Sequence, residues 1–244
     1  KGCQIVDTTC GDVMRVWKRV RSYAKTEFTA IIHGKADHEE TRATASRATT
    51  DVGGHYLVIL TIEDCEYVCN YIMGGGVKKD FLQKFSNAHS SGFDPDEHLK
   101  KIGVANQTTM LKGETEEIQK KLYKAIQDRD GEKAAENFQF FDTICGATQE
   151  RQDALYEMLK LEMDMLLVVG GYNSSNTTHL VEIGQEKIPS FFIRDAKCLE
   201  SFEQILHFDL ENKIEKRTYS GNYFNDSSPI TVGITAGASC PNNL

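Results

Sequence analysis

Two of the seven cysteines stand where thiol chemistry is expected. Cys10 and Cys145 each lie beside a glycine, after a short apolar run and before a helical pattern. An odd number of cysteines without an evident signal peptide favours a reducing compartment and metal or redox chemistry. Their separation matches no zinc finger, because finger ligands come in closely spaced pairs. The other five fit the role of small apolar fillers: Cys3, Cys65, Cys69, Cys198 and Cys240.

An acid, a histidine and a hydroxyl occupy comparable positions. His38 and Glu40 open a helix-competent segment after the apolar run 28–32, and Thr108 follows the run that begins at residue 104. A carboxylate and a histidine at a strand end can serve general acid–base chemistry. Simpler alternatives stay open, with His38 as a surface residue and Glu40 as a first-turn charge that matches the helix dipole.

A dense cluster of hydroxyl and amide groups indicates an anion site. Ser174, Ser175 and Asn176 follow the apolar run 165–169 and two glycines, and they open a helical pattern. Unpaired N–H groups at a helix N-terminus bind phosphate. Serine and asparagine are also preferred N-caps, so capping is the alternative interpretation. Ser239 follows the last strand-like run and is a further candidate.

These candidates share one position in a repeated unit. A short β-rich run, a small or polar cluster and a helical period recur about eight times along the chain. Strands that alternate with helices predict parallel sheets covered on both faces, with active sites at the carboxyl ends of the strands. This many units suits two small α/β domains better than one sheet. We expect these domains over residues 1–141 and 142–244.

Some segments depart from the repeat. Residues 74–103 predict an excursion within the first domain, and residues 207–229 predict a long surface loop because they are polar with weak periodicity. Residues 198–206 predict a helix, and residues 230–234 predict the last strand.

Composition limits the class of protein. The 244 residues carry 28 Lys+Arg against 36 Asp+Glu, a net charge of −8. This balance argues against broad binding of nucleic acid or anionic membranes. No apolar stretch is long enough to span a bilayer. No Gly-x-Gly-x-x-Gly or Gly-x-Ser-x-Gly motif occurs, so nucleotide cofactors and serine hydrolysis have no support.

Six motifs occur in an order that resembles one enzyme family. They are residues 7–10 (DTTC), 33–41 (HGKADHEET), 106–109 (NQTT), 143–152 (TICGATQERQ), 168–177 (VVGGYNSSNT) and 233–239 (GITAGAS). Together they resemble the 4-hydroxy-3-methylbut-2-enyl diphosphate reductase (LytB) family, the terminal enzymes of the methylerythritol phosphate route to isoprenoids. The match runs from residue 3 to the end. The long inserts resemble the cyanobacterial and plastid branch.

The resemblance implies a trefoil of three small α/β domains around a [4Fe–4S] iron–sulfur cluster, held by three cysteines with the fourth iron open to the substrate's allylic hydroxyl. Two electrons from ferredoxin or flavodoxin, with protons, would remove that hydroxyl as water and give isopentenyl and dimethylallyl diphosphate. Cys10 and Cys145 would be two of the cluster ligands. The family's third cysteine precedes Cys10 in a domain absent here, and its C-terminal helix is missing, so we expect this chain to be incomplete.

The resemblance also implies roles for the remaining candidates. Glu40 would deliver a proton to the leaving oxygen, and His38 and Thr108 would shape that relay and contact the diphosphate end. The diphosphate would be bound by Ser174, Ser175, Asn176 and Ser239. The substrate is then a small allylic diphosphate, and neither nucleic acid nor a membrane is a partner. The location would be a plastid stroma or a bacterial cytoplasm, and a homodimer is left open.

Two other interpretations stay open. A non-catalytic family descendant or an incomplete fragment, acting as a diphosphate-binding or partner subunit, would keep the fold without the redox step. The presence of Glu40, both cysteines and the diphosphate-end hydroxyls speaks against this. A hydrolase or zinc enzyme would contain zinc without iron.

Overall fold

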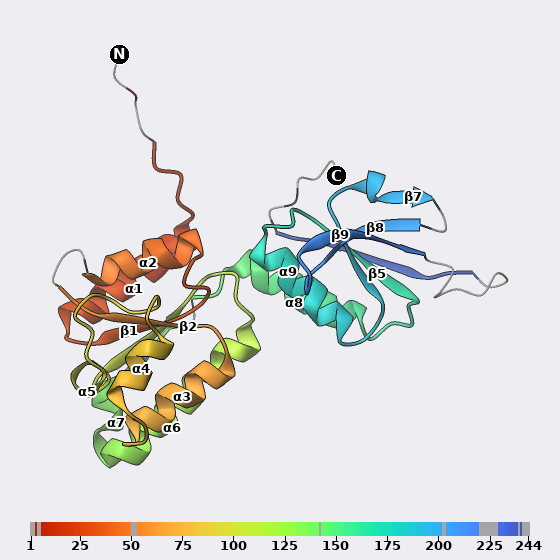
Figure 1. Cartoon of the computed structure of the whole chain (residues 1–244). Coiled ribbons are helices and arrows are strands. Elements are labelled where there is room, and N and C mark those ends of the chain that lie inside the picture. Colours follow the sequence, from red (N-terminus) through yellow and green to blue (C-terminus); the bar gives the residue numbers. More distant parts are fainter. Residues whose placement is uncertain are drawn as a thin grey trace. The chain divides into compact units, whose positions relative to one another are not determined.

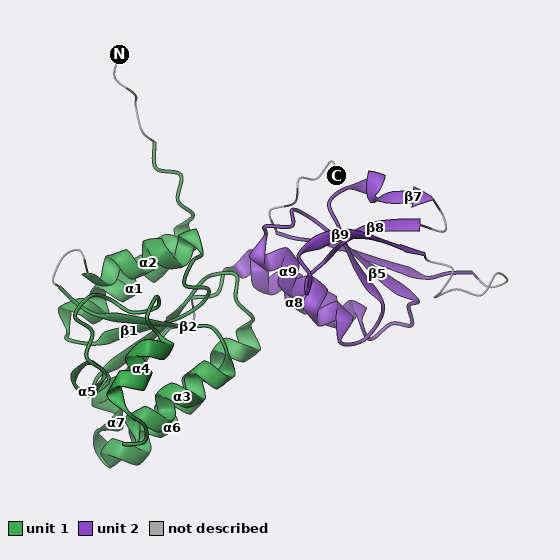
Figure 2. Ribbon diagram, viewed as in Figure 1, with its two compact units in different colours: residues 1–145 green, residues 146–244 purple. Residues whose placement is uncertain are grey.

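The chain folds into two compact units, Lys1–Cys145 and Gly146–Leu244 (Figures 1 and 2). The computed structural model describes residues 3, 6–49, 53–141, 143–201, 204–219, 229–238 and 240. The domain boundary predicted from the sequence lies after residue 141. Each unit contains one sheet with helices packed against it.

Unit 1 is built on a four-stranded parallel sheet. The strands are β1 (Thr29–His33), β2 (Tyr56–Ile59), β3 (Ile102–Asn106) and β4 (Phe138–Phe140), in the order β2-β1-β3-β4. Every residue of the two central strands, β1 and β3, is buried. Near-continuous apolar runs are typical of parallel strands covered on both faces.

Two helices, α1 (Gly11–Lys25) and α2 (Glu39–Thr49), cover one face of this sheet (Figure 1). Successive side chains of a strand point to opposite faces, so Ala30 and Ile32 of β1 face these helices. α1 presents one apolar stripe to them, and Tyr23 from this stripe donates a hydrogen bond to the backbone oxygen of β3 at residue 104, at 2.8 Å. The stripe explains why the segment is helical and which side of it is buried.

The other face packs against α3 (Ile62–Ile72) and α6 (Lys112–Asp130). Ile31, the β1 side chain between the two that face α1 and α2, belongs to this second core. Thr61 is the N-cap of α3, and its hydroxyl oxygen accepts from the Asp64 N–H at 3.2 Å.

The excursion predicted over residues 74–103 lies in unit 1 and contains two short helices, α4 (Lys78–Lys84) and α5 (Pro95–His98). Phe81 and Phe93 from this segment belong to the same core as α3 and α6. A short 3-10 turn, η1 (Gly131–Lys133), and α7 (Ala134–Asn137) connect α6 to β4.

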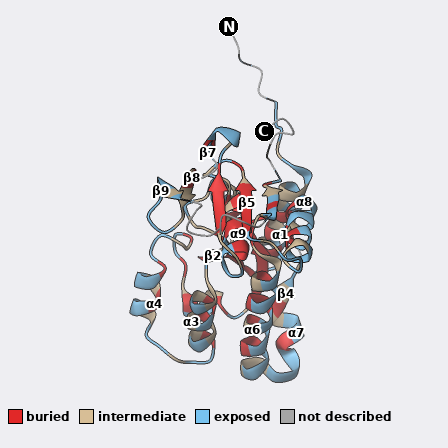
Figure 3. Ribbon diagram, turned by 90° about the vertical axis from the view of Figure 1, so that its right-hand side faces the viewer, coloured by how far each residue is buried: buried red, intermediate tan, exposed pale blue. Residues whose placement is uncertain are grey.

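Unit 2 has a mixed sheet in the order β10-β5-β6-β8-β7. β5 (Met165–Val169), β6 (Ser190–Ile193) and β10 (Val232–Ala236) are parallel. The helices α8 (Gly146–Met158) and α9 (Ser175–Gln185) pack against each other and against these strands. Figure 3 shows that β5 is buried.

The predicted parallel pairing holds for β5, β6 and β10 of this unit, whereas its other strands pair antiparallel. The 3-10 turn η2 (Ala196–Cys198), the strand β7 (Leu199–Ser201) and the start of β8 (Gln204–Asp209) occupy the segment predicted to be a helix. β8 pairs antiparallel with β6, β7 and β9 (Ile214–Tyr219), so part of the predicted surface loop is a hairpin. β9 is almost entirely exposed, and an antiparallel edge that faces water needs no apolar run.

The α/β class predicted from the sequence is confirmed in both units. Among the helices of the described residues, none combines the length and the apolar character that crossing a membrane requires.

Candidate functional site

Glu40 and Thr108 meet at the carboxyl end of the unit 1 sheet. α2 follows β1 and Thr108 follows β3, and these strands are parallel neighbours, so both segments leave the same edge. The Thr108 N–H donates to Glu40 Oε1 at 2.7 Å, and the Thr108 hydroxyl donates to Oε2 at 3.0 Å. One residue therefore holds both oxygens of the carboxyl group.

Burial raises the pKa of Glu40 above its ordinary value. The two hydrogen bonds from Thr108 and the neighbouring His38 oppose this change, because they favour the ionised carboxylate. Burial outweighs them. A carboxyl group whose pKa is raised keeps its proton closer to neutral pH, which suits a general acid.

His38 caps α2. Its carbonyl oxygen accepts from the Arg42 N–H at 2.9 Å, and its Nδ1 accepts from the Glu40 N–H at 3.2 Å. A backbone N–H can only donate, so Nδ1 carries no proton and the ring proton lies on Nε2. The histidine is half-buried, and its Nε2–H is the ring group left for a ligand.

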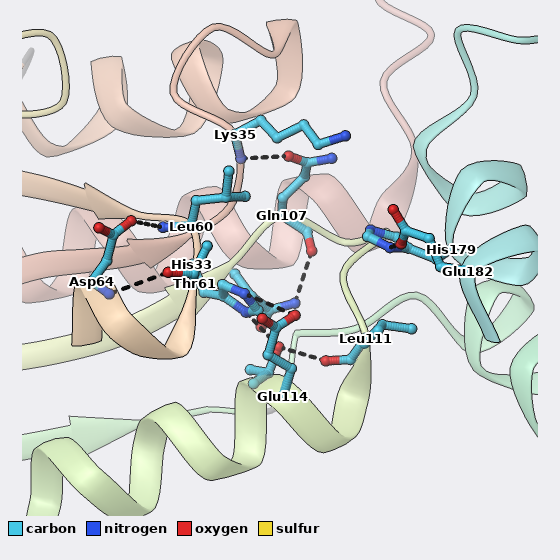
Figure 4. Close-up of polar contacts among 12 residues, drawn as sticks. His33, Lys35, Leu60, Thr61, Asp64, Gln107, Leu111, Glu114, His179 and Glu182 are labelled. Carbon is cyan, nitrogen blue, oxygen red and sulfur yellow. Dashed lines mark hydrogen bonds and ion pairs between the residues drawn. The ribbon is translucent and has the colours of Figure 1, made fainter. Parts of the chain in front are cut away.

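Gln107 was not among the predicted site residues, yet its side chain joins the segment around Lys35 and Thr41 to the loop that carries Thr108. Its Oε1 accepts from the Lys35 N–H at 3.2 Å (Figure 4). The same oxygen accepts from the Thr41 hydroxyl at 3.0 Å, and Nε2 donates to Thr109 Oγ1 at 2.7 Å. Gln107 is 1% exposed. It thus fixes the loop before α2 to the loop that carries Thr108.

His33, at the end of β1, is also buried and fastens the start of α6. Its Nδ1 lies 2.8 Å from the Thr115 hydroxyl, which itself donates to the Leu111 carbonyl oxygen at 3.0 Å. The hydroxyl therefore accepts the Nδ1 proton. Among the described residues Nε2 has no hydrogen-bond partner, and Glu114 Oε2 lies 3.6 Å from it (Figure 4). His33 thus links β1 to the helix that follows the Thr108 loop.

Cys145 is joined through its backbone to the loop that carries Thr108. Its backbone N–H donates to the Thr108 carbonyl oxygen at 3.1 Å. Two residues earlier, the Thr143 hydroxyl donates to Asn106 Oδ1 and accepts from the Asn106 N–H at 3.3 Å. These bonds tie the segment before α8 to the end of β3, so the thiol and the carboxyl group belong to the same strand end.

Cys10 stands at the N-cap position of α1, and its side chain makes no capping hydrogen bond. Only three residues separate α1 from β1, so the helix runs back along the strand and begins near the carboxyl ends of the sheet. The fold thus directs Cys10 toward the edge that carries Glu40, Thr108 and Cys145. Cys10 is exposed.

The two thiols fit part of a metal site. Neither is in a disulfide, Cys10 is exposed and Cys145 is partly exposed, and thiolates are the usual ligands of iron–sulfur clusters. Within the described ranges, no group of three His, Cys, Asp or Glu side chains lies close enough to hold a metal ion. The donor chemistry therefore suits a cluster to which Cys10 and Cys145 contribute two ligands of a larger set.

The second group of candidates gathers at the start of α9 in unit 2. Ser174 is the N-cap, and its hydroxyl oxygen accepts from the Thr177 N–H at 3.3 Å. Ser175 Oγ lies 3.5 Å from His179 Nε2, and His179 Nδ1 lies 2.7 Å from Glu182 Oε2. The capping interpretation is therefore correct for Ser174, and its hydroxyl proton is still available to a ligand.

Asn176 is the clearest sign of a ligand site here. It is 4% exposed, and both polar atoms of its side-chain amide lack a hydrogen-bond partner among the described residues, as does Thr177 Oγ1. Buried polar groups are normally paired, so unpaired ones at a helix N-terminus point to a polar ligand. The chain comes close to this turn at Gly237, where a Cβ would stand 2.1 Å from Thr177 Oγ1. Ser239 lies outside the described residues.

Comparisons with known proteins place the chain in one group. The sequence model described as "LytB protein" matches residues 1–244. A 4-hydroxy-3-methylbut-2-enyl diphosphate reductase from Gloeobacter violaceus is 50% identical over 246 residues, and one from Crocosphaera subtropica is 49% identical over 246 residues. These alignments cover 100% of this chain but 57% and 59% of those proteins. The chain therefore spans less than two thirds of their length.

A solved structure supports the fold. The Plasmodium falciparum E-1-hydroxy-2-methyl-but-2-enyl-4-diphosphate reductase is similar with a TM-score of 0.61 and 21% identity, over 98% of this chain and 56% of that one. At this identity the likeness concerns the architecture alone.

Proposed function

The chain belongs to the LytB protein family, and from that premise we propose that it forms the acid-bearing and phosphate-binding part of a 4-hydroxy-3-methylbut-2-enyl diphosphate reductase. The observation that carries the proposal is the adjacency of a half-buried acid, Glu40, to a free thiol, Cys145, through Thr108. The reaction would replace the allylic hydroxyl by hydrogen, with two electrons and two protons consumed and water released. The products would be isopentenyl and dimethylallyl diphosphate of isoprenoid biosynthesis.

Glu40 would be the catalytic acid. Its raised pKa lets the carboxyl group hold a proton for the departing hydroxyl. Thr108, which contacts both carboxyl oxygens, would keep the Glu40 side chain in the same orientation before and after each proton transfer. The Nε2–H of His38 would donate to the oxygen-rich end of the substrate.

Cys10 and Cys145 would hold two irons of a [4Fe–4S] cluster that needs further ligands. When bound, the cluster would supply the electrons and a Lewis-acidic iron for the departing hydroxyl. Cys145 is fixed to Thr108 by its backbone N–H, so the chain itself keeps this ligand in register with the acid.

The first turn of α9 would bind the diphosphate. The Ser174 hydroxyl, the Ser175 hydroxyl and the Asn176 amide can donate to phosphate oxygens together with the free N–H groups of the helix. Ser239 would join them. Hydroxyls, an amide and a helix N-terminus can hold a diphosphate in an acidic protein without a cluster of basic residues.

Electrons would come from ferredoxin or flavodoxin. The protein would act in a plastid stroma or in a bacterial cytoplasm.

The test is anaerobic turnover of the iron- and sulfide-reconstituted holoenzyme that contains this chain. Reduced methyl viologen serves as the electron donor and 4-hydroxy-3-methylbut-2-enyl diphosphate as the substrate. We expect isopentenyl and dimethylallyl diphosphate in the product mixture. Binding of the substrate with iron bound but without product would instead support a non-catalytic diphosphate-binding subunit.

A further inference from the structure

The basic residues of this acidic chain are concentrated on α1 and α2. The net charge is −8, yet these two helices hold seven of its 28 Lys+Arg residues and three of its 36 Asp+Glu residues. α1 alone carries five basic residues against the single carboxylate of Asp12. The bias lies in one layer of unit 1, on one side of the sheet (Figure 1).

These charges face solvent. The apolar stripe of α1 turns toward the sheet, which leaves Arg15, Lys18, Arg19 and Lys25 exposed on the other side. The side chain of Arg15 is 70% exposed. We call these four residues the α1 basic face.

Few neighbouring groups neutralise this face. Arg15 is paired with Asp12 within the helix. Lys18 and Lys25 have no ion pair within the described part of the chain. The Arg19 guanidinium lies 3.6 Å from the centre of the Phe141 ring, a contact that holds the side chain in place without cancelling its charge. The face therefore offers a positive potential to a partner of opposite charge.

The face begins next to a proposed cluster ligand. α1 starts directly after Cys10, and a helix rises about 1.5 Å per residue, so Arg15 and Lys18 lie about 8 and 12 Å from Cys10 along the axis. A partner that contacts the α1 basic face would therefore approach this thiol closely.

We propose that the α1 basic face is the docking surface for an acidic protein that delivers electrons to the site; this inference rests on the proposed function. In each encounter the reduced partner would lose one electron and the site would gain one, so two encounters supply the two electrons of the reaction. Protons would arrive separately through Glu40.

The dimensions and composition of the face favour such a partner. α1 is about 22 Å long, which suits the small interfaces of transient electron-transfer complexes. Met14, 43% exposed beside Arg15, adds an apolar contact at the Cys10 end. The excess negative charge of the rest of the chain would repel long polyanions such as nucleic acid. Met14 is the one large apolar side chain of α1 that is exposed, which gives little apolar area to enter a membrane.

Calorimetric binding of an oxidised, acidic plant-type ferredoxin to the chain tests this inference without turnover. The double variant Lys18→Glu, Lys25→Glu should bind roughly tenfold more weakly at low ionic strength, and the difference should shrink as salt screens the charges. The matched control is Lys120→Glu, Lys133→Glu, which makes the same charge change on exposed residues of α6 and η1, and it should bind within about twofold of the wild type. Circular dichroism verifies that both variants are folded.

Equal weakening by both double variants, or unchanged binding in the Lys18, Lys25 variant, would overturn the proposal. Binding of duplex DNA or anionic vesicles to the α1 basic face, without binding of ferredoxin, would also overturn it. Turnover of the holoenzyme with methyl viologen separates the two hypotheses. If turnover proceeds but the Lys18, Lys25 variant binds ferredoxin as the wild type does, the docking surface is wrong. If turnover fails, the proposed function is wrong.

Discussion

Replacing Thr108 with valine should raise the pKa of Glu40 further. The change removes the hydroxyl that donates to Oε2 at 3.0 Å, and it keeps the backbone N–H that donates to Oε1 at 2.7 Å. Because the lost hydrogen bond favours the ionised carboxylate, its removal favours the protonated acid. Valine has nearly the shape of threonine, so the surrounding packing should persist.

The magnitude follows from the single bond that is lost. A hydrogen bond to a charged group contributes about 1.5–3 kcal/mol. Glu40 is partly accessible to water, which can replace part of this interaction, so the lower end applies. About 1.4 kcal/mol corresponds to one pH unit, and the midpoint of the Glu40 titration should therefore move up by about one pH unit.

The assay is an NMR titration of the chain with ¹³C-labelled glutamate side chains, in which Glu40→Gln identifies the Glu40 signal. Thr108→Ser keeps the hydroxyl and should keep the wild-type midpoint. A midpoint in Thr108→Val that stays the same or falls, in a chain shown to be folded, would refute the assignment of Thr108 as the group that governs the acid.

Further predictions concern the α9 site, its packing and the pH dependence of stability. Asn176→Leu should weaken pyrophosphate binding about tenfold or more by calorimetry and should raise the free energy of unfolding, because the buried amide atoms have no hydrogen-bond partner among the described residues. A lower free energy of unfolding with intact binding would contradict a ligand role. Gly237→Ala should destabilise the chain by about 1–3 kcal/mol in urea, because a Cβ there meets a threonine hydroxyl of α9. Gly113→Ala, in the first turn of α6 with open space around it, should leave the free energy of unfolding unchanged or slightly higher. Burial lowers the pKa values of His55 and His98, whose rings stack at 3.6 Å, so the folded state favours the neutral rings. The free energy of unfolding should therefore fall as the pH drops below about 6.5. His98→Asn should make this pH dependence shallower, and an unchanged slope would contradict the role of the histidine pair.

The part of the site that lies at the carboxyl ends of the strands could be predicted from the sequence. In a parallel sheet the carboxyl ends of neighbouring strands share one edge, so Glu40 and Thr108 could be expected to meet although 68 residues separate them. The family resemblance inferred from the six motifs is confirmed by the match over the whole chain. Gln107 and the burial of His33 were not predicted. A glutamine beside a strand end has the same sequence signal whether it points to solvent or joins two loops.

The second sheet was harder to predict for a different reason. β9 pairs with β8 but leaves its side chains in water, so its residues need no apolar alternation, and a polar strand of this kind resembles a loop in the sequence. Asn176 presents the converse difficulty. Its position predicts a helix start, whereas its burial and unpaired amide depend on the close approach of the chain at Gly237.

The central claim is that Glu40 is the acid of a reductive dehydroxylation. Its most direct test compares the turnover of Glu40→Gln and Glu39→Gln in the reconstituted holoenzyme, with reduced methyl viologen as the electron donor. Glu39 lies one residue earlier on α2 with a side chain that is 93% exposed, so its variant makes the same chemical change outside the site. We predict that Glu40→Gln lowers kcat by about 10²–10⁴-fold and that Glu39→Gln leaves kcat within about twofold. Equal turnover by the two variants, at equal iron content, would contradict the account.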